Sequence, residues 1–150
     1  MTDDDDIRLI SFEARYAEDA VRMWRASKQA VLGVEELHNF EDHLHYLSVV
    51  LTRDNRIYLA MFNEVVVGLM ATDGAWINQL YIHIDYQGKG IGSRMVNLAK
   101  QLSSGSLSLH TFEVNLKARR FYEKHGFSMV GRGRDNEENL PDVLLTWNRS

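Results

Sequence analysis

The chain has 150 residues, of which 45% are hydrophobic and 25% charged, values that are ordinary for one globular domain of a soluble protein. Its formal net charge of −4 argues against a general nucleic-acid-binding protein, which would carry a strongly basic surface. Because the chain contains no cysteine, its residues exclude disulfide bonds, cysteine-ligated zinc and a cysteine nucleophile.

The N-terminal residues predict a cytoplasmic protein that has no membrane partner. The run Met1-Thr2-Asp3-Asp4-Asp5-Asp6 lacks the basic start and the apolar stretch of a secretory signal, and we expect residues 1–6 to be a frayed, solvated end. The longest apolar run, residues 65–71, is far shorter than the roughly 20 residues that span a bilayer. The chain has no repeat, no low-complexity linker and only one proline, so a single domain over residues 1–150 is predicted.

Hydrophobic spacing predicts strands and helices in alternation. The expected elements are a strand at 7–12, helices at about 18–31 and 41–52, strands at 57–62, 65–71 and 76–84, a helix after the glycines at 88–92, a strand at 106–112, a helix at 115–125, and strands at 127–131 and 143–147. The segment 65–71 is almost wholly apolar, which is typical of a central strand covered on both faces. This order predicts an α/β (α+β) fold, in which helices pack on a mixed sheet, and not a doubly wound parallel sheet.

A glycine-rich segment, Gln87-Gly88-Lys89-Gly90-Ile91-Gly92, separates a strand from a helix. Glycines allow positive φ and the close approach of a ligand. A helix N-terminus offers unpaired N–H groups and the positive end of its dipole, so a diphosphate ligand is the natural hypothesis. A tight strand-to-helix turn without a ligand explains the same pattern and stays open as the alternative.

The glycine spacing disfavours two other nucleotide-binding motifs. A P-loop needs the pattern G-x-x-x-x-G-K-[ST], and no Gly-Lys-Ser or Gly-Lys-Thr follows here. A dinucleotide-binding G-x-G-x-x-G would need glycine where the chain has Ser93. It would also need an acidic residue about 20 positions later, where the chain has His110 and Thr111.

A second motif lies on the helix expected at 115–125, where Asn115, Arg119 and Tyr122 share one face. Alone, such an aromatic and polar stripe is typical of the edge of a core. Together, the two motifs resemble those of the GNAT N-acetyltransferase superfamily. The signature [QR]-x-x-G-x-[GA] is matched at Gln87, Gly90 and Gly92, and N-x-x-A-x-x-[FL]-Y-x-x-x-G-F is matched at Asn115, Ala118, Phe121, Tyr122, Gly126 and Phe127. Residues 136–143 are similar to a bacterial branch of the superfamily whose acceptors are not obvious from sequence.

The resemblance implies the GNAT acyl-CoA N-acyltransferase fold, with a mostly antiparallel mixed sheet of six or seven strands and about four helices. It implies acetyl-CoA as co-substrate and no metal. The pantetheine arm would pair with the backbone of Leu80, Tyr81 and Ile82. The pyrophosphate would lie on the amides of Gln87, Gly88, Lys89, Gly90, Ile91, Gly92 and Ser93. Asn115, Phe121 and Lys124 would also contact the cofactor, and Tyr122 would lie near the thioester sulfur.

The implied reaction is direct transfer of an acetyl group to a primary amine, with Tyr122 as the general acid for the leaving thiolate. An alkylamine has a pKa of about 10 and is mostly protonated at neutral pH, so a base or a water chain must remove a proton. The strand before the glycines has no carboxylate in Ile77-Asn78-Gln79, unlike some members of the family, and Ile84 stands where many members have proline. The candidate bases are His110, Glu113, Glu36 and Asp142, and the sequence does not choose among them.

Several alternatives stay open. A non-catalytic acyl-CoA sensor is the main rival, although a sensor would not need the proton donor Tyr122. The acceptor is a small-molecule amine, such as a polyamine, an amino acid derivative or an aminoglycoside, or a protein amine, and a homodimer is common in the superfamily. Arg119-Arg120 is interpreted either as a contact to the ribose phosphate of coenzyme A or as a solvated face, and the loop 136–142 either as a holder of a cationic acceptor or as an acidic turn. His38, His43 and His45 do not share one helical face, so no metal site is predicted.

Overall fold

The computed structural model describes residues 6–33 and 36–150, so the expectation for the acidic residues 1–5 lies outside the described residues. Within the described ranges, seven strands alternate with helices along the chain. In order they are β1 (Ile7–Ser11), η2 (Ala14–Tyr16), α1 (Ala17–Leu32), α2 (Phe40–His45), η3 (Tyr46–Leu51), α3 (Thr52–Asp54), β2 (Arg56–Phe62), β3 (Val65–Thr72), β4 (Ile77–Ile82), η4 (Ile84–Tyr86), α4 (Ile91–Leu102), β5 (Ser106–Phe112), α5 (Leu116–Lys124), β6 (Ser128–Gly133) and β7 (Asp142–Asn148).

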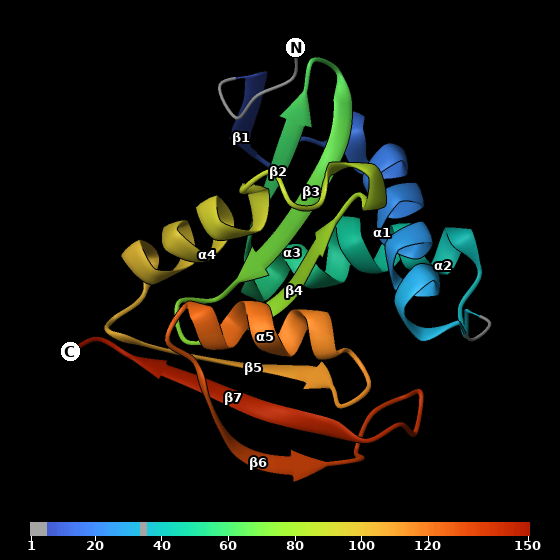
Figure 1. The fold of residues 1–150 in the computed structure, drawn as a ribbon. Helices are drawn as coiled ribbons and strands as arrows, with labels where there is room; N and C mark the ends of the chain where they lie inside the picture. The colour runs from blue at the N-terminus through green and yellow to red at the C-terminus, as the bar shows by residue number, and fades with distance from the viewer. Residues whose placement is uncertain (1–5, 34–35) are drawn as a thin grey trace.

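The strands form two antiparallel sheets that meet at one point (Figure 1). The first sheet has the order β1-β2-β3-β4, and the second has the order β5-β7-β6. They are joined by a single parallel bridge between Trp76 and Ser108, where the Ser108 N–H donates to the Ala75 carbonyl at 2.9 Å. The mixed, mostly antiparallel arrangement is therefore confirmed, and its distinguishing feature is that β4 and β5 separate beyond this bridge.

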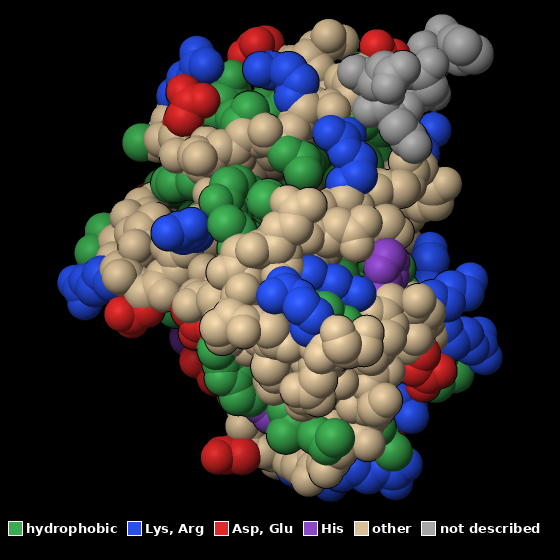
Figure 2. Space-filling model, turned by 90° about the vertical axis from the view of Figure 1, so that its left-hand side faces the viewer, with side chains coloured by type: hydrophobic (Ala, Val, Ile, Leu, Met, Phe, Trp, Pro, Cys, Tyr) green, Lys and Arg blue, Asp and Glu red, His purple; other side chains and the backbone are tan. Residues whose placement is uncertain are grey.

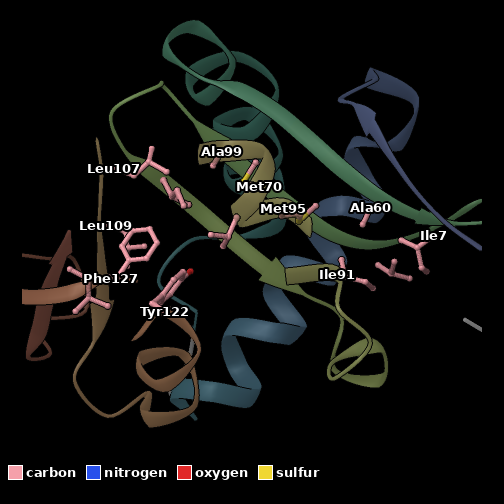
Figure 3. Close-up of a cluster of buried hydrophobic side chains, with 14 of the residues drawn as sticks. Ile7, Ala60, Met70, Ile91, Met95, Ala99, Leu107, Leu109, Tyr122 and Phe127 are labelled. Carbon is pink, nitrogen blue, oxygen red and sulfur yellow. The ribbon is translucent and has the colours of Figure 1, made fainter. Parts of the chain in front are cut away.

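Helices cover both faces of the first sheet, and the side chains of each strand alternate between these two faces. On β3, Leu69 packs in the cluster formed with α1, whereas its neighbour Met70 packs in the cluster formed with α4 and α5. Both residues are fully buried, so the prediction of a central strand covered on both faces is confirmed. Figure 3 shows part of the second cluster, in which Ile91 and Met95 of α4 point toward the sheet.

The helix expected at 41–52 has a more complex form than its hydrophobic spacing indicates. Asn39 begins α2, since its Oδ1 accepts the Asp42 N–H at 2.8 Å. The chain then widens into the π-helix η3 before the short α3 ends at Asp54. The strand expected at 76–84 is shorter than predicted because η4 begins at Ile84, so β4 ends at Ile82, directly before the glycine-rich turn.

Candidate active site

A cavity of about 530 Å³ lies where β4 and β5 separate. Its wall is formed by the C-terminal half of α1, the edges of β4 and β5, the glycine-rich turn, α5 and the loop between β6 and β7. Because neither β4 nor β5 has a strand partner along this gap, the cavity exposes backbone edges as well as side chains.

The hydrogen-bond pattern of β4 determines which peptide groups face the cavity. The His83 N–H donates to the Val67 carbonyl at 2.8 Å, and bonded pairs alternate along an antiparallel ladder. Tyr81 therefore directs its peptide groups to β3, while Leu80 and Ile82 direct theirs to the cavity. The expectation that all three residues offer backbone groups to a ligand is corrected to Leu80 and Ile82.

The outward Ile82 carbonyl is already engaged by protein side chains. It accepts hydrogen bonds from Ser27 Oγ at 3.2 Å and from Gln87 Nε2 at 3.3 Å. Gln87 in turn accepts from Lys117 Nζ at 2.6 Å. The signature glutamine thus fixes the end of β4 relative to α5, and Leu80 is left with the more accessible peptide groups of the edge.

The glycine-rich turn presents the N-terminus of α4 to the cavity. Gly90 is the N-cap residue with φ of 84°, a left-handed conformation that favours glycine, and no side chain caps the helix. The Gly90 carbonyl accepts the Arg94 N–H, so the N–H groups of Ile91, Gly92 and Ser93 have no partner within the helix. These three amides form a site suited to an anion. Figure 2 shows the face of the molecule on which α4 lies, where Lys and Arg side chains occur in several separate groups.

The two sequence motifs meet where α4 and α5 pack together. A β-carbon at Gly92 would lie 3.0 Å from Cζ of Phe121, so any larger residue would require the ring to move. The Phe121 ring lies 4.7 Å from the His125 ring, and His125 Nε2 is 2.9 Å from Ser93 Oγ. The start of α4 is thereby held against α5.

The other residues predicted to contact the ligand do not all line the cavity. Asn115 lines the cavity, but its Oδ1 caps α5 by accepting the Ala118 N–H at 3.1 Å. Lys89 and Lys124 are not among the residues that line the cavity, whereas Lys117, which sequence reasoning missed, is. The helical positions alone could have identified Lys117, since it lies one turn before Phe121 and seven residues before Lys124.

Tyr122 is a buried polar residue of the site, with 7% of its surface exposed. Its ring packs beside Phe127, with 5.6 Å between ring centroids (Figure 3), and beside Phe121 at 5.2 Å. Burial raises the pKa of the Tyr122 phenol above its ordinary value, and the charge of Tyr81 acts in the same direction. Tyr122 lines the cavity, and in the described ranges no hydrogen bond to its hydroxyl from the protein is found. Every fully buried polar side-chain atom in those ranges has a hydrogen-bond partner. Because the Tyr122 hydroxyl has none, it is not fully buried, and it reaches the cavity.

The candidate bases separate into two groups. His110 and Asp142 line the cavity, with His110 Nδ1 3.9 Å from Asp142 Oδ1. Glu113 and Glu36 do not line it: Glu113 lies 3.8 Å from Arg132, and Glu36 lies 3.5 Å from Lys28. The structure thus favours His110 and Asp142 by position.

A second charged cluster at the cavity was not apparent from the sequence. Lys28 of α1 donates to Glu138 Oε2 at 2.7 Å and reaches Glu36 at 3.5 Å, and all three side chains are less than 20% exposed. Burial is the largest influence and lowers the pKa of Lys28, but the hydrogen bond to Glu138 and the charges of Tyr81, Glu138 and Glu36 together outweigh it, so the pKa is raised. The pair fastens the loop before β7 to α1, 110 residues away in the chain.

The three histidines considered as metal ligands have separate environments. His38 Nε2 lies 2.9 Å from Glu137, while His43 is buried 4.3 Å from the Trp24 ring. Across residues 6–33 and 36–150, no group of three His, Asp or Glu side chains is placed to hold a metal ion. The same ranges contain no helix that is both long and apolar enough to cross a membrane.

The two arginines of α5, Arg119 and Arg120, lie outside the cavity. Arg119 Nη1 donates to the Glu113 carbonyl at 3.1 Å, which fixes it to the turn before the helix. Neither Arg119 nor Arg120 lines the cavity. Their interpretation as a solvated helix face is therefore favoured over a contact to the coenzyme.

Comparison with known proteins identifies the family of the chain. Residues 53–129, which include β4, the glycine-rich turn and α5, match the model of the acetyltransferase (GNAT) domain. The peptidyl-lysine N-acetyltransferase YjaB of Salmonella typhimurium is 37% identical over 79 residues, 53% of this chain and 54% of that protein. The spermine/spermidine N(1)-acetyltransferase of Bacillus subtilis is 33% identical over 70 residues, 43% of this chain and 46% of that protein. The match therefore spans about half the length of these curated relatives.

The similarity of fold extends over more of the chain. The crystal structure of the PaiA N-acetyltransferase of Thermoplasma acidophilum, in complex with coenzyme A, superposes with a TM-score of 0.71. The superposition covers 95% of this chain and 98% of that one at 16% sequence identity. At this identity the likeness shows the fold alone.

Proposed function

Because this chain belongs to the GNAT acetyltransferase family, we propose that it is an N-acetyltransferase that binds acetyl-CoA between β4 and β5 and acetylates a primary amine. The observation that carries the proposal is the uncapped N-terminus of α4. Its three amides open onto the same cavity as the Leu80 peptide groups and the Tyr122 hydroxyl. A diphosphate and an acyl thioester at the two ends of one ligand would match these two features.

The residues present fit such a ligand. Gly90 has no β-carbon to cover the amides of Ile91, Gly92 and Ser93, and an anion there would interact favourably with the helix dipole. The outward Leu80 groups would bind the pantetheine amide in the manner of an added strand. When bound, acetyl-CoA supplies the acetyl group as a reactive thioester.

Two groups of the chain would then assist the transfer. The Leu80 N–H faces the cavity and would donate to a carbonyl oxygen as that oxygen gains negative charge. Like any phenol, Tyr122 keeps its proton at neutral pH, and burial raises its pKa further; it would donate to a thiolate leaving beside it. Since a raised pKa makes complete proton transfer harder, we expect hydrogen-bond donation to be the larger part of its contribution.

The relatives indicate the class of acceptor. One is named for peptidyl-lysine and the other for spermine and spermidine, and both kinds of acceptor present an alkylammonium group. We therefore propose a primary alkylamine as the acceptor of this chain. The half-buried entrance near Lys28, Tyr81 and His110 would receive it from the α1 side of the sheet.

A ligand-dependent melting experiment tests the binding half of the proposal. Acetyl-CoA at 100 times its Kd should stabilise the fold by about 2.7 kcal/mol and raise the Tm, whereas NAD and ATP should have no comparable effect. Equal stabilisation by ATP would contradict the assignment of the cavity. Stabilisation by acetyl-CoA without turnover of any amine would favour the acyl-CoA sensor.

A further inference from the structure

The cavity holds a histidine and a carboxylate from adjacent strands on its acceptor side. His110 lies on β5 and Asp142 begins β7, and the two strands pair in the second sheet. On β5, Leu109 packs in the cluster with Tyr122, and its neighbour His110 faces the opposite side of the sheet. His110 thus lies on the face of the second sheet opposite to Leu109.

Both side chains are held in place by their neighbours. The His110 ring stacks on Trp76 with 5.4 Å between ring centroids and 14° between planes. Asp142 is 8% exposed, and its Oδ2 accepts a hydrogen bond from Asn136 Nδ2 at 3.0 Å. A β-carbon at Gly133 would lie 3.3 Å from Asp142 Oδ1, so glycine on β6 leaves room for the carboxylate.

The orientation of the ring leaves one nitrogen for chemistry. His110 Nδ1 lies 3.9 Å from Asp142 Oδ1, and therefore Nε2 is the nitrogen not directed at the carboxylate. The His110 side chain is 56% exposed, so it could exchange protons with solvent.

We propose that His110 is the base that accepts the proton of the acceptor's ammonium group, and that Asp142 is its positioning residue; this inference rests on the proposed function. The ammonium nitrogen loses one proton to Nε2 of the imidazole and keeps the electron pair with which it would attack the acetyl carbonyl. As the C–N bond forms, the C–S bond would break, and the second proton lost by the nitrogen would balance the one that the leaving thiolate takes up beside Tyr122. The ring becomes imidazolium opposite the Asp142 carboxylate and then returns the proton to solvent. The amine and the Tyr122 phenol act from opposite sides of the split between β4 and β5.

Other charged and titratable groups share the cavity with His110. Besides Asp142, they are Lys28 on α1, Tyr81 on β4, Tyr86 in η4, and Lys117 and Tyr122 on α5. Lys28 is engaged by two carboxylates and Lys117 by Gln87, and the three tyrosines pack in hydrophobic clusters. Among the described lining residues, the imidazole is the one side chain that is both exposed and able to accept a proton near neutral pH.

Steady-state kinetics of His110→Gln with spermine and a lysine peptide as probes test the proposal. We expect kcat to fall at least about 100-fold with little change in the KM for acetyl-CoA. His45→Gln is the matched control, because it makes the same change at an exposed histidine that does not line the cavity. The acidic limb of the wild-type pH–rate profile should vanish in His110→Gln, and the residual rate should rise at high pH as the amine deprotonates by itself.

Two further variants separate a chemical from a structural role. In His110→Ala, added imidazole should restore part of the lost rate if a base is missing, and a packing defect would not respond. Asp142→Asn should lower kcat less than His110→Gln does, because it removes the positioning group and keeps the base. A kcat of His110→Gln within about twofold of wild type, with the limb unchanged, would overturn the proposal.

A readout that does not depend on turnover is the NMR spectrum of the histidine rings. Titration with spermine should perturb the His110 imidazole signals, identified by their loss in His110→Gln, and leave those of His45 unchanged. Absence of any perturbation at His110 would argue against contact with the acceptor. If the wild-type chain acetylates neither probe, the proposed function fails together with this inference, whereas an active His110→Gln would overturn the inference alone.

Discussion

Gly92 at the start of α4 and Phe121 in the middle of α5 are in such close contact that a β-carbon at Gly92 would lie 3.0 Å from the Phe121 ring. This contact joins the two segments that carry the sequence motifs, although they are far apart in the chain. It also explains why the amides of α4 and the Tyr122 hydroxyl open onto one cavity, since Tyr122 follows Phe121 directly.

The first prediction concerns this contact. Gly92→Ala should displace the Phe121 ring and shift the adjacent amides, and overpacking of this kind costs about 1–3 kcal/mol. We therefore expect acetyl-CoA to bind at least about tenfold more weakly by isothermal titration calorimetry. Gly131→Ala is the control, because its new β-carbon would lie at an ordinary 3.7 Å from Leu144. Replacing the ring with the smaller leucine side chain, by Phe121→Leu in the Gly92→Ala background, should recover part of the affinity. Equal binding by all three variants would contradict the role of the contact.

Tyr122→Phe tests the proton donor while keeping the buried ring. Because the hydroxyl would act on the leaving thiolate and not on the bound ground state, kcat should fall by about 10²-fold or more, with the KM for acetyl-CoA nearly unchanged. Removal of the hydroxyl leaves no enclosed polar partner unsatisfied, so the Tm should stay within a few degrees of wild type. Unchanged turnover would show that Tyr122 is only a packing residue.

Local sequence signals predicted much of this fold. The apolar run of β3, the helix of α5 and the glycine-rich turn are each encoded by spacing within a short segment, and their positions in the structure agree with the prediction. The separation of β4 from β5 could not be predicted in this way. It depends on a contact between Trp76 and Ser108, which are distant in the chain, and no local pattern indicates such a contact. Likewise, the π-helix η3 follows the same apolar spacing as an ordinary helix.

The site was predicted less completely than the fold, because parts of it depend on long-range contacts. The motif helix indicated Lys124 as a ligand, but its side chain is exposed and Lys117 lines the cavity instead. The ion pair of Lys28 with Glu138 joins residues 110 positions apart, so no local pattern indicates their pairing. Among the four candidate bases, only the fold could show that two of them line the cavity.

The buried His43 predicts a pH dependence of stability. Burial lowers the pKa of His43 to about 4, with the charges of Arg25 and Lys28 acting in the same direction, whereas an unfolded chain has the ordinary value of about 6.5. Between these values the unfolded state binds more protons, so stability present above pH 6.5 is lost as the pH falls toward 4. The loss amounts to at most about 3 kcal/mol.

Urea unfolding at pH 7 and pH 5 measures this effect. His43→Phe keeps an aromatic ring against Trp24 but cannot titrate, so its free energy of unfolding should change less between the two pH values than that of wild type. His45→Phe, at an exposed position, should retain the wild-type pH dependence. The same slope in wild type and His43→Phe would show that other groups cause it.

Two neighbouring glutamates allow a matched test of the loop before β7. Glu138 pairs with Lys28 at an 11% exposed position, whereas Glu137 pairs with His38 at a 64% exposed one. Glu138→Gln should therefore lower the free energy of unfolding by about 1–3 kcal/mol, and Glu137→Gln by less than about 1 kcal/mol. Chemical unfolding of both variants measures the difference. Equal effects would mean that the Lys28 pair does not fasten the loop.

Measurement of acetyl transfer is the most direct test of the proposed N-acetyltransferase function. The wild-type chain is incubated with acetyl-CoA and either spermine or a lysine peptide, and thiol release is measured together with the mass of the acceptor. We predict that each released thiol accompanies one new acetyl group on an amine, at a rate that falls in both Tyr122→Phe and Gly92→Ala. Binding of acetyl-CoA with no acetylated amine, or transfer that neither variant affects, would contradict it.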